Sequence, residues 1–63
     1  MKKGDWVYTP RFCSVMLEEV FYSQSEAIKA GYNEPTHYKD TEYGILGKSI
    51  GKNQMVFAAF KKA

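Results

Sequence analysis

Cys13 and His37 are the residues whose chemistry could carry nucleophilic catalysis, because an imidazole can activate a thiol for covalent attack. The chain has a single Cys and a single His, so no other thiol–imidazole pair can form. Cys13 lies in an apolar run, where a cysteine usually acts as a small hydrophobic side chain. His37 follows Pro35 in a polar segment, where we expect it to face solvent or form a local hydrogen bond. We therefore expect no enzyme activity and rank a Cys/His enzyme last among the function classes.

Two further patterns resemble catalytic motifs. Glu18 and Glu19 are adjacent carboxylates, but neighbours on a strand point to opposite faces, so they are not expected to form an acid/base pair. We expect one to be solvated and the other to pair with a lysine across the sheet. Residues 44–49, Gly-Ile-Leu-Gly-Lys-Ser, end like a phosphate-binding loop. Their glycines are too close together and a strand follows, which excludes that motif.

Aromatic residues close to basic ones indicate a binding surface. Protein interfaces are enriched in Tyr, Trp, Phe, Met and Arg, whereas single-stranded nucleic acids stack on aromatic rings beside positive charge. We predict a non-enzymatic binding or adaptor module that contacts a protein partner, or a second copy of itself, through an exposed aromatic patch. The alternative is single-stranded nucleic-acid binding by the same rings with nearby cations. The candidate site residues are Trp6, Tyr8, Arg11, His37, Tyr38, Lys48 and Lys52.

The size of the chain limits how many aromatic rings can serve that surface. The 63 residues, with ten aromatics and a net charge of +2, are expected to form one domain over 1–63. A chain this short buries only about 60% of the surface that it exposes when unfolded. One Cys and one His exclude a disulfide within the chain and the Cys/His zinc frameworks, so no metal or cofactor is expected. Most of the aromatic rings are therefore needed in the core.

A short helix is predicted over residues 24–30. Ser23 and Glu26 have the spacing of a capping box, in which side chains satisfy free backbone N–H groups at the helix start. Gly31 is suited to the left-handed position that ends a helix, and Tyr32 can fold back onto the last turn. Pro35 prevents the helix from continuing.

The remaining regular elements read as strands over residues 6–9, 12–22, 43–50 and 54–61. In 12–22, the residues that point to one face of the strand and those that point to the other are both mostly apolar. Either both faces are covered, or a bulge near Glu18 and Glu19 changes which residues point to the core. Gly44 and Gly47 indicate a bulge, a bend or a close backbone approach. Residues 51–53 form a three-residue hairpin loop, and 33–42 are irregular.

This order predicts an α+β domain, strand–strand–helix–strand–strand. The preferred architecture is a strongly bent, four-stranded antiparallel sheet packed on one helix. The alternative is a partial barrel of the SH3-like kind, because residues 4–8, Gly-Asp-Trp-Val-Tyr, resemble the opening strand of such barrels.

The sequence also favours a cytoplasmic location. A lone cysteine suits a reducing compartment. No apolar segment of 7–15 residues follows the first lysines, so we expect no secretory signal. No apolar run approaches the ~20 residues of a membrane helix, so no membrane contact is expected.

Three segments resemble a group of short uncharacterised bacterial proteins associated with mobile elements such as integrative elements and prophages. They are residues 6–13, residues 31–38 and residues 47–59, and together with the intervening chain they span nearly the whole sequence. The resemblance implies an accessory role in the upkeep or transfer of such an element, or in its contest with the host. It implies no catalytic residue and no cofactor.

Overall fold

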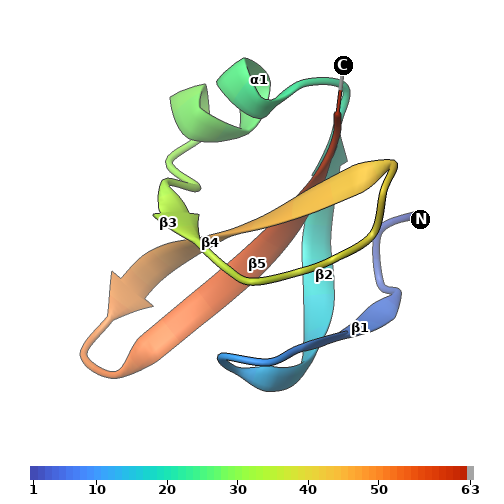
Figure 1. Ribbon diagram of the computed structural model, residues 1–63. Helices are drawn as coiled ribbons and strands as arrows, with labels where there is room; N and C mark the ends of the chain where they lie inside the picture. Colours follow the sequence, from blue (N-terminus) through green and yellow to red (C-terminus); the bar gives the residue numbers. More distant parts are fainter. Residues whose placement is uncertain (63) are drawn as a thin grey trace.

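The computed structural model describes residues 1–62 as five strands and one short helix (Figure 1). In chain order the elements are β1 (Trp6–Thr9), β2 (Cys13–Phe21), α1 (Gln24–Lys29), β3 (Glu34–Pro35), β4 (Tyr43–Gly51) and β5 (Gln54–Lys61). The α+β class is therefore confirmed. β3 is an addition to the expected order, since it forms two residues of the segment that was predicted to be irregular.

The strands form one sheet in the order β1-β2-β5-β4-β3. β1 pairs with β2, β3 with β4, and β4 with β5, all antiparallel. β2 and β5 instead run parallel, so the prediction of a purely antiparallel sheet is wrong. The sheet is neither strongly bent nor closed (Figure 1), which corrects both the strongly bent sheet and the SH3-like partial barrel.

β2 contains the bulge that was one of the two interpretations of its apolar pattern. Leu17 lies opposite Phe57, whereas Glu19 lies opposite Ala58, so Glu18 is an extra residue between two paired positions. The bulge changes which alternate residues face inward. Val15 and Leu17 are buried before it, and Val20 packs against the same core cluster after it.

β2 also changes partner along its length. Its first half, residues 13–16, pairs with β1, whereas pairing with β5 begins at Leu17. The N-terminal halves of β2 and β5 therefore diverge, and Figure 1 shows β2 and the β4–β5 hairpin pointing in different directions below their shared region. Only the C-terminal halves hold the two parts of the sheet together.

The helix prediction is confirmed, with α1 ending one residue earlier than expected. The Glu26 N–H donates to Ser23 Oγ at 3.3 Å, and Glu26 Oε2 accepts from the N–H of Tyr22. Gly31 has φ +100, and its N–H donates to the Ile28 carbonyl. The Tyr32 N–H donates to the Ala27 carbonyl, which completes the paired hydrogen bonds of a Schellman ending.

The β4–β5 hairpin is confirmed, but its loop is shorter than predicted. Gly51 pairs with Gln54, so only Lys52 and Asn53 connect the strands, and the register shifts between Ser49 and Gly51. Asn53 takes φ +60, a left-handed conformation that asparagine tolerates in tight turns.

Buried side chains form two clusters, one on each face of the sheet. The cluster on the helix side contains Ala27, Tyr32, Leu46, Ala58 and Phe60. The cluster on the other side contains Val7, Val15, Leu17, Ile45, Phe57 and Ala59. Both faces of β4 and β5 are therefore covered, which explains the apolar residues at successive positions of these strands.

Candidate binding surface and end pocket

The outer side of the β1–β2 hairpin exposes large apolar side chains. Trp6 is 68% exposed, Tyr8 is 65% exposed and Met16 is 43% exposed. Trp6 lies directly opposite Met16 in the ladder, and Tyr8 lies opposite Ser14. Trp6 and Tyr8 project to the same side because they are two residues apart on one strand. We call Trp6, Tyr8 and Met16 the aromatic surface.

β1 is also an edge strand of the sheet. The Gly4 N–H donates to the Leu17 carbonyl, and the Leu17 N–H donates to the Asp5 carbonyl, both at 2.9 Å. Hydrogen-bonded positions alternate along an antiparallel pair, so after Asp5 the backbone groups of Val7 point toward β2 and those of Trp6 and Tyr8 point outward. The same two residues therefore present both exposed rings and outward backbone groups.

A shallow depression of about 250 Å³ adjoins the aromatic surface at Tyr8. His37 and Tyr38 line it, so the structure places these two predicted residues beside Tyr8. His37 is exposed. Tyr38 is half-buried and packs against the core cluster that contains Val7.

Tyr38 and Asp40 are joined within this depression. The Tyr38 hydroxyl donates to Asp40 Oδ2 at 3.4 Å. Burial, together with the nearby Asp40 carboxylate, raises the pKa of Tyr38. The backbone N–H of Glu42 and that of Tyr43 donate to Asp40 Oδ1, and these bonds lower the pKa of the Asp40 carboxyl. Asp40 thus anchors the connection that leads into β4.

Arg11 links the β1–β2 turn to the segment that carries His37. Its Nη1 donates to the Pro35 carbonyl at 3.1 Å, and its guanidinium carbon lies 5.1 Å from the Phe12 ring centre. Arg11 therefore holds two parts of the fold together while remaining exposed.

The structure does not bring Lys48 to the aromatic surface. Lys48 Nζ lies 4.6 Å from the ring centre of Tyr32 and 3.5 Å from the Ala30 carbonyl, on the helix side of the sheet. Lys52 lies in the β4–β5 turn. The predicted site residues therefore separate into one group near Tyr8 and two lysines elsewhere.

The residues considered for catalysis take other positions. Cys13 is the first residue of β2, as its apolar run predicted, but it is exposed and has φ +63, which corrects its interpretation as a small hydrophobic side chain of the core. Cys13 does not line the depression that contains His37. Burial raises the pKa of Tyr32, and the charges of Glu18 and Glu19 raise it further. Glu18 and Glu19 lie at the bulge of β2, where the regular alternation of side chains between the two faces is interrupted.

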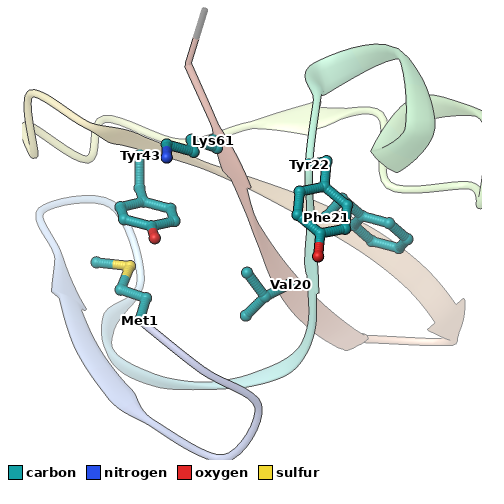
Figure 2. A pocket seen from close by; sticks show the side chains of 6 residues that line it. All are labelled: Met1, Val20, Phe21, Tyr22, Tyr43 and Lys61. Carbon is teal, nitrogen blue, oxygen red and sulfur yellow. The ribbon is translucent and has the colours of Figure 1, made fainter.

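A second hollow, the end pocket, was not predicted from the sequence. It has a volume of about 310 Å³ and lies at one end of the sheet. Figure 2 shows Met1 and Tyr43 on one side of it and Val20 and Tyr22 on the other, with Lys61 near Tyr43. Its six lining residues are Met1, Val20, Phe21, Tyr22, Tyr43 and Lys61.

Sequence reasoning missed Met16 and the end pocket for different reasons. Met16 stands between Ser14 and Glu18 in one alternate series of β2. Because these two residues are polar, the pattern indicated that this series faces solvent. The end pocket combines residues from the start, middle and end of the sequence, and no local pattern indicates that they meet.

No helix within residues 1–62 has the length and apolar character needed to cross a membrane. In the same part of the chain, no three His, Cys, Asp or Glu side chains are grouped so that they could hold a metal ion. Comparison with protein families, curated proteins and solved structures finds no match for this chain.

Proposed function

We propose that this protein is a non-enzymatic binding module that contacts a partner protein through the aromatic surface. The observation that supports the proposal is the exposure of Trp6 and Tyr8, at 68% and 65%, side by side with Met16 on one edge hairpin. Contiguous exposed apolar side chains mark interaction sites. Trp and Tyr contribute most of the energy in many protein interfaces.

Among the predicted site residues, the positions of the cations favour a protein partner over a nucleic acid. A single-strand binder needs cations that follow its aromatic platform. Lys48 instead packs over Tyr32, and Lys52 lies in the β4–β5 turn. Arg11 is the cation of the predicted set that stays with the group near Tyr8, and its guanidinium already binds the Pro35 carbonyl.

The edge position of β1 supplies a second mode of contact. An extended segment of a partner can pair with the outward backbone groups of Trp6 and Tyr8 while its side chains pack on their rings. The depression lined by His37 and Tyr38 extends this contact beyond the end of β1. The proposed partner therefore offers an extended segment with apolar or aromatic side chains.

The test compares proteins captured from the native host by the wild type and by the double variant Trp6→Ala, Tyr8→Ala. Tyr38 is left intact because it packs against the core. Each partner captured by the wild type is then purified and its affinity measured. Loss of interface anchors costs about 2 kcal/mol or more, so the double variant should bind at least about 30-fold more weakly.

Ile50→Ala is the matched control, because Ile50 is 56% exposed but lies on β4. It should retain wild-type affinity. If the double variant binds as well as the wild type, the aromatic surface is not the interface. Binding to mixed oligonucleotides that weakens steeply with salt would favour the nucleic-acid alternative. Sedimentation of the isolated protein shows whether the partner is a second copy.

We also propose that this binding serves a bacterial mobile element and takes place in the cytoplasm. Support comes from the resemblance of residues 6–13, 31–38 and 47–59 to short bacterial proteins of such elements, and from the lone cysteine. The first of these segments includes both Trp6 and Tyr8. Finding genes for close relatives outside such elements would contradict the proposal.

A further inference from the structure

We propose that the end pocket binds a small organic carboxylate, with an apolar body inside the cavity and the carboxylate at its rim. This site is separate from the aromatic surface and shares none of its residues. The proposal therefore stands or falls independently of the proposed function.

The pocket lies at the carboxyl ends of the parallel pair. Val20, Phe21 and Tyr22 are at or just beyond the end of β2, and Lys61 is the last residue of β5. In open α/β sheets, ligands bind in the crevice outside the carboxyl ends of the parallel strands, and the end pocket has the corresponding position beside β2 and β5. The chain continues from β2 into α1, which packs on the face of the sheet opposite to Met1 and Val20.

The lining combines an apolar wall with hydrogen-bond donors. Met1 and Val20 both pack against the core cluster on this side of the sheet, and they supply the apolar part. Tyr22 and Tyr43 carry hydroxyl groups, and Lys61 carries an ammonium group. None of the six lining residues is acidic, so the pocket favours an anion over a cation.

The donors at the rim are available to a ligand. Tyr43 is held in place through its backbone, because its N–H donates to Asp40 Oδ1 at 3.1 Å. The neighbouring lysine is already engaged, since Lys62 Nζ donates to the Asp40 carbonyl at 2.7 Å. Tyr22 is 87% exposed and can turn toward or away from the cavity. Tyr43 and Lys61 are paired across β4 and β5, so the sheet fixes the backbone positions from which both side chains reach the rim.

The volume limits the size of the ligand. About 310 Å³ is at the lower end of the range of small-molecule sites, roughly 300–1,000 Å³. A smaller hollow of about 210 Å³ adjoins the end pocket. It shares Tyr22 and Lys61 with the end pocket and is also lined by Gln24 and Phe60. A ligand the size of a phenyl ring with a short acidic tail is small enough for the end pocket, with its carboxylate placed near Lys61.

The experiment is a titration of isotope-labelled protein with hydrocinnamate, followed by two-dimensional NMR. The backbone amide signals of Val20, Tyr22, Tyr43 and Lys61 should shift and saturate, with a dissociation constant on the order of 1 mM. Those of Tyr8 and His37 should stay in place. Hydrocinnamyl alcohol, which has the same apolar body without the charge, should bind clearly more weakly.

Lys61→Gln should weaken hydrocinnamate binding about fivefold, as expected for one exposed ion pair. Tyr43→Phe should weaken it about threefold through the loss of one hydrogen bond. Lys52→Gln is the matched control, because it removes the same charge from a turn outside the pocket. Equal weakening by Lys52→Gln and Lys61→Gln, equal binding of the alcohol, or no saturating shift at the pocket amides would each overturn the proposal.

Discussion

Gly44 and Gly47 both lie on β4, and at each the missing side chain leaves room for a different neighbouring side chain. A Cβ on Gly44 would meet the Phe60 ring, at 2.7 Å from Cε1 and 2.8 Å from Cε2. Phe60 is buried in the cluster on the helix side and cannot easily move. A Cβ on Gly47 would lie 2.6 Å from Cε of Met55, the end of a flexible and half-buried side chain, and 3.3 Å from Cε1 of the Phe57 ring.

We therefore expect Gly44→Ala to lower the free energy of unfolding by about 1–3 kcal/mol, as overpacking of a core does. Gly47→Ala should cost less than about 1 kcal/mol, because Met55 can adopt another rotamer. Urea denaturation of both variants measures the difference. An equal cost at the two sites would show that the Phe60 ring adapts as readily as the Met55 side chain.

Single residues with local partners were the most predictable part of the chain. Ser23, Glu26 and Gly31 act on backbone groups within a few positions, so their spacing alone predicted α1 and its ending. The exposure of Trp6 and Tyr8 was not predictable in the same way. It depends on what covers β1, and the sequence around these rings is as apolar as that of a buried strand.

Among the elements, the connection from β3 to β4 depends on one carboxylate. Asp40 accepts hydrogen bonds from the N–H groups of Glu42 and Tyr43 and from the Tyr38 hydroxyl. These bonds hold its pKa below the ordinary value of 3.8. The folded state thus binds the proton less readily than the unfolded chain does, so the stability contributed by Asp40 is complete above that ordinary pKa and is lost as the pH falls through the folded pKa.

The prediction is that Asp40→Asn destabilises the protein near neutral pH and that its deficit shrinks as the pH falls below about 4. Urea denaturation of both proteins from about pH 7 to about pH 2.5 measures this deficit. A deficit that stays constant over the whole range would mean that the charge of Asp40 does not contribute.

The pairing of elements was less predictable than their existence. The strand segments 6–9 and 54–61 were found at their observed bounds, because their composition and flanking turns are local signals. The parallel pairing of β2 with β5 depends on residues about 40 positions apart, Leu17 and Phe57. Similarly, β3 exists because two residues lie beside β4, although nothing in their own sequence favours a strand.

Across the whole molecule, the pairings of β5 with β2 and with β4 hold the sheet together. β5 is paired with β4 over its full length and with β2 over its second half. Ile45, Ala58 and Ala59 are almost fully buried there. β1 and β3 lie at the edges, and β3 is only two residues long.

We expect amide hydrogen exchange to follow this arrangement. The N–H groups of Ile45 and Ala59 should exchange only through global unfolding, with an opening free energy near the total stability, about 5 kcal/mol for a domain of this size. In β3 only Glu34 carries an amide hydrogen, because Pro35 has none, and this N–H should exchange through local opening at least about tenfold faster. Equal protection at the edges and the centre would show that the sheet opens only as one unit.

The central strand of the sheet is also the last of the five strands to leave the ribosome. A nascent chain that ends before residue 54 has no β5, so β2 and β4 lack the strand that lies between them. Until β5 emerges, Leu17 and Leu46 have no completed core in which to bury. The unpaired strands β2 and β4 therefore favour association with other chains until β5 is available to pair with both of them.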